Sequence, residues 1–221
     1  MPRSIPSLAA LAGVLALGAC GIFGGPSAPE PAYEVLREEA PFEIRAYPAL
    51  AVASTPMGTG LGEGTGGAFR RLFGYISGDN RGDREVAMTA PAVQQPATDE
   101  DGGEEGGEQI EMTAPVLQQP EAEGQWRMVF VLPAGMTAET APVPTEESVR
   151  LDTLPARRVA AVRFSGLLRD ANVVEARDRL LDWIEGEGLA PAGPAEVAGY
   201  NPPWTLPWFR RNEILVPVEG G

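Results

Sequence analysis

"VAMTAPAVQQP" (Val86–Pro96) is nearly repeated by "IEMTAPVLQQP" (Ile110–Pro120), and an acidic, glycine-rich run lies between the two copies. Biased, disordered segments do not accumulate Met and Thr, so drift in a low-complexity region is a poor explanation for the repeat. In each copy the residues up to the proline can form a strand. The proline itself lacks an N–H and is tolerated at a strand end or a sheet edge. The repeat therefore predicts two related strands.

Short, partly alternating apolar runs occur on both sides of the repeat, and Pro41 and Pro48 punctuate the first of them. Such runs are typical of β-strands. The additional strands predicted in this way are Tyr33–Glu38, Phe42–Tyr47, Ala49–Ser54, Trp126–Pro133, Val149–Leu154, Arg157–Gly166 and Asn212–Val218.

Two segments show helical periodicity instead. Within Gly67–Gly78 the apolar face consists of Phe69, Leu72, Phe73 and Ile76, and Gly78 is the expected end of the helix. Within Asn172–Gly188 the apolar face consists of Val173, Val174, Leu180, Leu181 and Ile184, with Asn172 as the expected N-cap. The order of strands, helix and strands thus occurs twice. It predicts an α+β fold with a curved antiparallel sheet or barrel and two helices packed outside it.

The N-terminal residues have the features of a targeting segment. Leu8–Leu17 is an apolar run too short to span a bilayer, and Leu17-Gly18-Ala19-Cys20 resembles the lipobox of bacterial lipoproteins, which are cleaved before an acylated Cys. We therefore expect a signal peptide over residues 1–19, a flexible tether over 20–32 and one folded domain over 33–218. The alternative is an ordinary secretory signal in which Cys20 is incidental.

An acylated Cys20 would place the protein in the cell envelope. Gly21, rather than Asp, follows the Cys. In the lipoproteins that this segment resembles, such a residue is compatible with delivery to the periplasmic face of the outer membrane.

The composition excludes several classes of function. A net charge of −14 argues against nucleic acid and anionic membrane surfaces as partners. The chain has no His, a single cysteine (Cys20) and no Lys, so all 17 basic residues are Arg. Ser-His-Asp, Cys-His and Ser-Lys machinery and the usual zinc sites are therefore excluded, and no resident metal is expected. An ordinary hydrolase would have to use two carboxylates.

Three further patterns have both a functional and a plain interpretation. Gly62-x-Gly64-x-x-Gly67 meets the dinucleotide-binding pattern, but that fingerprint belongs to parallel βαβ units, so a flexible loop is favoured. The acidic run from Asp99 to Glu108 is read as a solvated loop without EF-hand spacing. The second helix carries four acidic residues, Glu175, Asp178, Asp182 and Glu185. They are interpreted as the solvated face of the helix. The alternative is that two of them form the carboxylate pair of a glycosidase.

A cluster of aromatic residues near the C-terminus stands among three prolines, and it consists of Tyr200, Trp204, Trp208 and Phe209. Such a segment can wall an apolar pocket or cover the end of a core. Composition alone favours the second possibility.

Several distinctive segments follow one another along the chain, namely "YEVL", "FEIRAYP", "GAFRRLFGYISGDN", the doubled "MTAP", "WRMVFVLP", "RRVAAVRFSG" and "GYNPPWTLPWFRRNEI". Taken together and in this order, they resemble the SOUL heme-binding protein family. The resemblance covers Tyr33–Val218. It implies a distorted antiparallel β-barrel of two pseudo-symmetric halves flanked by two helices, a fold shared with bacterial small-molecule-sensing domains. In members of the family the doubled motif lies on neighbouring strands.

The resemblance also implies reversible binding of heme or another tetrapyrrole in a shallow apolar groove along the first helix. Carried over by motif position, the binding residues would be Phe69, Arg70, Phe73, Gly74 and Tyr200. Apolar side chains would wall the macrocycle, and Arg70 or Arg71 would pair with its propionates. Some members use an axial His, which this chain lacks, and some place a Lys at the position of Gly74. Heme is therefore expected to bind without strong axial ligation.

The sequence thus predicts a membrane-anchored binding or carrier protein for a tetrapyrrole rather than an enzyme. Two alternatives remain. One is a lipoprotein that binds another apolar small molecule, as the related sensor domains do. The other is an enzyme acting on heme, in which a carboxylate or a Tyr would serve as acid or base.

Overall fold

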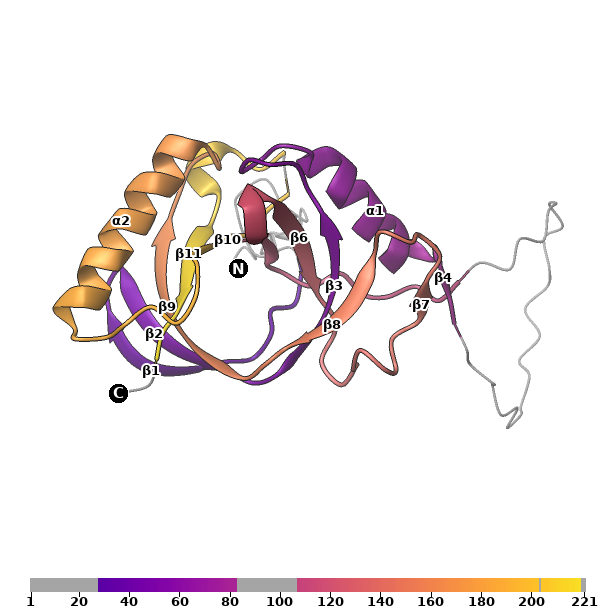
Figure 1. The fold of residues 1–221 in the computed structure, drawn as a ribbon, viewed down its shortest axis with the longest axis horizontal. Helices are drawn as coiled ribbons and strands as arrows, with labels where there is room; N and C mark the ends of the chain where they lie inside the picture. The colour runs from indigo at the N-terminus through magenta and orange to yellow at the C-terminus, as the bar shows by residue number, and fades with distance from the viewer. Residues whose placement is uncertain (1–27, 83–106, 203, 220–221) are drawn as a thin grey trace, which may run out of the picture.

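The computed structural model describes residues 28–82, 107–202 and 204–219 of the chain (Figure 1). A large sheet contains the strands β1 (Glu34–Glu39), β2 (Phe42–Tyr47), β3 (Leu50–Pro56), β5 (Val116–Pro120), β6 (Trp126–Val131), β8 (Arg150–Leu154), β9 (Arg157–Phe164), β10 (Glu196–Gly199) and β11 (Asn212–Pro217). A short ribbon pairs β4 (Asn80–Arg81) with β7 (Val143–Pro144), and the helices are α1 (Thr65–Ser77) and α2 (Asp170–Gly186).

The large sheet has nine strands in the order β1-β2-β9-β11-β10-β5-β6-β3-β8. Each of its pairings is antiparallel. Figure 1 shows the sheet curling into a half-barrel, with α1 outside one side and α2 outside the other. The predicted α+β fold, a curved antiparallel sheet flanked by two helices, is confirmed.

The strand order reveals two halves of the same plan. In chain order the first half is β2-β3-α1-β5-β6 and the second is β8-β9-α2-β10-β11. The halves meet where β5 pairs with β10. The first strand of each half pairs with the opposite half, because β2 lies beside β9 and β8 lies beside β3. The two halves therefore exchange their leading strands.

Side chains alternate between the faces of each strand, and this alternation divides the core. Along β11, Ile214 and Val216 pack with α2, whereas Leu215 joins a second cluster on the opposite face, inside the half-barrel. Glu213, which has the same parity as Leu215, is fully buried with it. A third cluster lies between α1 and the strands β3 and β6. The interior of the half-barrel thus contains a buried carboxylate as well as apolar side chains.

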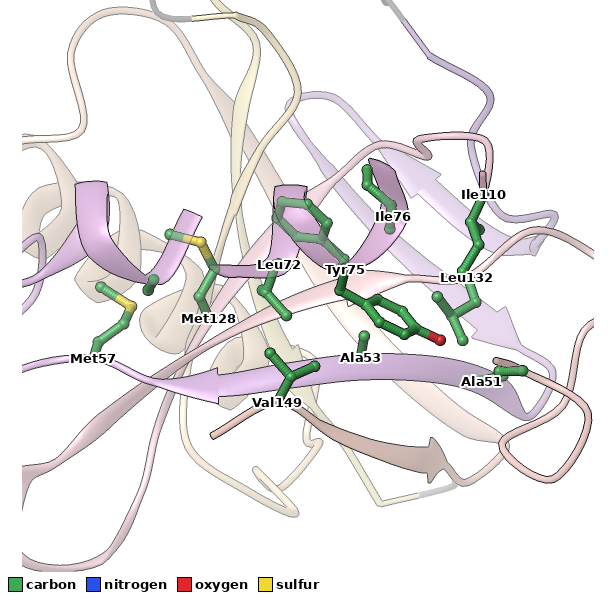
Figure 2. Close-up of a cluster of buried hydrophobic side chains, with 13 residues drawn as sticks. Ala51, Ala53, Met57, Leu72, Tyr75, Ile76, Ile110, Met128, Leu132 and Val149 are labelled. Carbon is green, nitrogen blue, oxygen red and sulfur yellow. The ribbon is translucent and has the colours of Figure 1, made fainter. Parts of the chain in front are cut away.

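The helix α1 buries a different stripe from the one predicted. Leu72 and Ile76 are buried as expected, but Tyr75 rather than Phe73 lies beside them (Figure 2). Tyr75 can be buried completely because its hydroxyl donates to the carbonyl oxygen of Pro142 at 2.9 Å. Phe73 is instead 48% exposed. Gly78 ends the helix as predicted, with a φ of 120° that disfavours other residues.

The helix α2 begins earlier than predicted, with Arg169 at the N-cap position. Asn172 is not the N-cap, since it lies inside the first turn and its side-chain amide donates to the carbonyl oxygen of Leu167 at 2.9 Å. Val174, predicted to face the core, is 41% exposed. The prediction of a solvated acidic face is confirmed, because its four carboxylates are exposed.

The first Met-Thr-Ala-Pro copy and residues 99–106 of the acidic run lie outside the described residues. In the second copy the strand β5 follows Pro115, so the prediction of a strand before the proline is wrong there. The backbone before Pro115 forms its hydrogen bonds outside the sheet. The N–H of Ile110 donates to the carbonyl oxygen of Ile76, and the N–H of Ala114 donates to that of Pro29. Of the described helices, neither combines the length and the apolar character needed to cross a membrane.

Candidate functional site

A groove of about 290 Å³ opens between α1 and the end of β10. Four parts of the chain form it: the residues before β1, α1, the residues that lead into β5, and the end of β10 with the residues that follow it. Its lining is mainly apolar and consists of Ala28, Phe69, Phe73, Met112, Thr113, Ala114, Val116, Gly199, Tyr200, Asn201, Pro202 and Trp204.

The helix contributes two parallel aromatic rings to this groove. Phe69 and Phe73 are stacked, with ring centroids 5.9 Å apart and an interplanar angle of 13°. Phe69 is fixed from behind by an edge-on contact with Phe130 of β6 at 5.5 Å. The aromatic pair therefore presents a firm apolar wall, while the half-exposed Phe73 leaves part of its ring open to a ligand.

Tyr200 lines another part of the groove and is 3% exposed. Its hydroxyl donates to Oε2 of Glu213 at 2.7 Å, and the guanidinium of Arg211 stacks 3.9 Å above its ring. Glu213 also accepts hydrogen bonds from Arg45 at 2.6 and 3.1 Å and from Arg211 at 3.0 Å. The groove thus rests on a buried network of charged groups.

The network sets the protonation of Tyr200 and Glu213. Burial opposes ionisation of Glu213, but its hydrogen bonds and the charge of Arg45 keep the pKa of the carboxyl below its usual value. Burial, together with the negative charge of Glu213, strongly raises the pKa of Tyr200. Tyr200 is therefore a neutral donor at physiological pH, and its oxygen is unsuited to act as a phenolate ligand for iron.

The remaining sequence-predicted residues lie on α1 but outside the groove lining. Arg70 is exposed and, among the described residues, forms no ion pair. Arg71 donates instead to β3, to Oγ1 of Thr55 at 2.9 Å and to the carbonyl oxygen of Pro56 at 2.5 Å. A Cβ at Gly74 would lie 2.3 Å from Oδ2 of Asp79, so this position faces the end of the helix. The structure thus brings together Phe69, Phe73 and Tyr200 but not Arg70 and Gly74.

Residues before β1 also contact the site. Ala28 lines the groove, the carbonyl oxygen of Pro29 accepts from the N–H of Ala114 at 2.8 Å, and Glu30 pairs with Arg211 at 2.8 Å. The part of the predicted tether that the structure describes therefore lies against the domain.

The two tryptophans of the aromatic segment after β10 do not cover the core, although Tyr200 is buried in it. Tyr200 and Trp204 line the groove, and Trp204 and Trp208 are 73% and 65% exposed. The possibility that composition favoured, a cover over the end of the core, is wrong for these tryptophans. Trp204 therefore adds an exposed apolar surface to the groove.

Sequence reasoning missed Met112 as a groove residue and missed the buried partners of Tyr200. The signal for Met112 was available, because it is the Met of the second Met-Thr-Ala-Pro copy. Nothing in the local pattern marks Glu213, which stands between Asn212 and Ile214 at the start of β11. Its partner Arg45 is distant in sequence, so only the three-dimensional fold reveals the pair.

Comparison with solved structures shows the same fold at low sequence identity. The C-terminal domain of EcmrR superimposes with a TM-score of 0.51 and 13% identity, covering 86% of this chain and 99% of that domain. A hydrolase from Listeria innocua superimposes with a TM-score of 0.54 and 13% identity, covering 83% of this chain and 94% of that one.

Sequence comparison is more specific. Heme-binding protein 1 of Mus musculus is 25% identical over 184 residues, which cover 80% of this chain and 84% of the mouse protein. The SOUL heme-binding protein family matches residues 28–104 and 101–217, almost the whole of the predicted domain. With the half-barrel and the aromatic groove, these matches show that the chain belongs to the SOUL heme-binding protein family.

Proposed function

We propose that the protein binds and carries heme or another tetrapyrrole in the groove between α1 and the end of β10, and that a lipid on Cys20 anchors it to a membrane. The observation that carries the proposal is the apolar groove itself, which is lined by the stacked pair Phe69 and Phe73 together with Tyr200. In a member of a heme-binding family, this groove is the expected place for a flat, apolar ligand.

The groove fits a macrocycle that is held along one part of its surface. Its volume of about 290 Å³ is just below the range for ligand pockets, roughly 300–1,000 Å³. The exposed faces of Phe73 and Trp204 extend the apolar surface beyond it. A tetrapyrrole would therefore be only partly covered, which favours reversible binding and release. Arg70, which is exposed and adjacent to Phe69 in the chain, would pair with a propionate.

The groove offers little to the iron of heme. The chain has no His, and the hydroxyl of Tyr200 is committed to Glu213. The thioether of Met112 is the remaining groove atom of a type that ligates heme iron. Binding should therefore depend on apolar contact and on charge at the rim, and iron-free porphyrin should bind almost as well as heme.

The test is a pair of titrations, hemin and protoporphyrin, followed by the Soret shift and by tryptophan quenching. We expect the two dissociation constants to agree within roughly tenfold, a difference of at most about 1.4 kcal/mol. Phe73→Asp should abolish both, because it places a charge in the apolar wall. Tight hemin binding without porphyrin binding would contradict weak ligation, and unchanged binding by the Asp variant would place the site elsewhere.

The anchor has a separate test. Cys20→Ser removes the predicted acylation site. The variant should then either stay in the supernatant when membranes are sedimented or keep its signal peptide uncleaved. Lipoproteins carry several acyl chains, which is enough for stable attachment. Equal processing and equal sedimentation of the Ser variant would show that Cys20 is not the anchor.

The lack of a His ligand favours one second candidate function, the binding of another apolar small molecule by a lipoprotein of the same fold. The titrations distinguish the two candidate functions, since a protein specific for another small molecule would bind neither hemin nor protoporphyrin. An enzyme acting on heme would instead show loss of the Soret band when a reductant is added.

A further inference from the structure

A second cavity, of about 350 Å³, lies beneath the N-terminal half of α2. Val173 and Val174 of the helix form one wall, and Pro120, Trp126 and Ala195 lie among the residues of the other walls. Two charged side chains, Asp170 and Arg177, also line it. None of these residues contributes to the groove beside α1.

This cavity and the α1 groove occupy corresponding places in the two halves of the fold. The α1 groove is lined by α1, by the residues leading into β5 and by the residues leaving β10. The second cavity is lined by α2, by Pro194 and Ala195 leading into β10, and by Pro120 at the end of β5. Exchanging the two halves therefore exchanges one cavity for the other. The two sites meet opposite ends of β10.

The walls of the two sites differ in their chemistry. The described lining of the α1 groove contains no charged side chain, and the exposed Arg70 is the neighbour in sequence of its residue Phe69, whereas the α2 cavity carries one carboxylate and one guanidinium. Arg177 is further neutralised by its exposed neighbour Asp178, whose carboxylate lies 2.8 Å away. A ligand with two carboxylates would meet Asp170 without a compensating excess of positive charge. The α2 cavity therefore suits a neutral apolar molecule.

We infer that the α2 cavity is a second ligand site, which takes a neutral aromatic or alicyclic molecule independently of the tetrapyrrole groove. The topological equivalence supplies the reason for a preformed cavity at this place. The apolar side chains Val173, Val174 and Trp126 supply the binding surface. Because the sites share no residue, both can be occupied in the same molecule.

The experiment uses the neutral fluorescent probe N-phenyl-1-naphthylamine and the full chain carrying Phe73→Asp, so that the α1 groove is blocked. This protein should still bind the probe at one site per chain. Adding Val174→Asp should weaken binding by roughly tenfold or more, because it puts a carboxylate at the apolar mouth. Val174 is 41% exposed, so the folded state should tolerate the change. Ala171→Asp adds the same charge to an exposed position of the same helix end and should leave binding unchanged.

Ala195→Phe, which fills the cavity without adding charge, gives a second test should Val174→Asp lower the unfolding temperature. It should also abolish probe binding. Failure of Phe73→Asp protein to bind the probe, or equal binding by the Val174→Asp, Ala195→Phe and Ala171→Asp proteins, would overturn the inference. Because no tetrapyrrole is present, the result is independent of the heme titrations. Hemin binding by the Val174→Asp single variant should be unaltered.

Discussion

Truncation of Phe73 measures what the α1 groove contributes to binding. A Phe side chain offers roughly 200 Å² of surface, so the 48% that is exposed at Phe73 amounts to about 100 Å² that a ligand can cover. At about 25 cal/mol per Å², this burial contributes up to about 2.4 kcal/mol, or roughly 60-fold in Kd. Phe73→Ala should therefore weaken hemin and protoporphyrin to a similar extent, by about 30- to 60-fold.

The assay is a Soret titration of the wild type, Phe73→Ala and a control, Val35→Ala. Val35 of β1 is 46% exposed, close to the exposure of Phe73, but it does not line the groove. Its truncation should leave Kd unchanged. The ring of Phe73 is half-exposed in the free protein, so its loss should cost the fold about 1 kcal/mol or less. A change in Kd below about threefold, with the fold intact, would refute the assignment of Phe73 to the binding wall.

Four further predictions follow from the same contacts. Glu213→Gln should cost about 3–5 kcal/mol in urea unfolding, because it removes the fully buried counter-charge of Arg45 and leaves only the less buried Glu43 to pair with that guanidinium; a cost near zero would show that the network is dispensable. Since folding lowers the pKa of Glu213, its stabilisation is complete above its unfolded pKa of about 4.3 and disappears as the pH falls through the lower folded value. Glu213→Gln should therefore flatten the loss of stability on acidification below about pH 5, and an acid limb identical to that of the wild type would contradict this. Replacing residues 99–106 by a Gly-Asn turn should preserve or raise the melting temperature, since shortening a loop reduces its closure entropy by about 0.6 kcal/mol per halving. Glu108 is kept because its N–H donates to Oδ1 of Asn80 at 2.9 Å, and a fall of many degrees would show that the loop docks. Met112→Leu should shift the hemin spectrum slightly and leave protoporphyrin binding unchanged; loss of both would show that Met112 acts by packing alone.

Local periodicity was sufficient for most of the fold, because β2 and α1 form where alternation and the helical repeat indicate. Prediction from local periodicity failed where contacts between distant parts of the chain determine which residue is buried or which segment becomes a strand. The core position expected of Phe73 belongs to Tyr75, whose hydroxyl finds a carbonyl oxygen across the fold. The strand β10 escaped prediction because its four residues, Glu196–Gly199, are too short to show a period, although it lies at the centre of the sheet.

The candidate site shows the same division. Phe69, Phe73 and Tyr200 were identified through family resemblance, and the fold brings them to one groove. Arg70 and Gly74 share the helix but are not among the lining residues, since adjacent positions on a helix do not share a face. Glu213 could not be predicted as a support for Tyr200, because a single acidic residue in an apolar strand gives no sign of the partners that bury it.

The exchange of leading strands between the halves has a consequence for how the domain assembles. Without β2 the second half would expose the edge of β9, and without β8 the first half would expose the edge of β3. Neither half can close its sheet alone, so the chain should fold slowly and in a single cooperative step governed by long-range pairing. If the halves are separated by proteolysis or by engineering, neither fragment should then fold alone, and the two should fold only by associating with each other. A molecule bound in either cavity would protect the whole domain against unfolding, not only the half it touches.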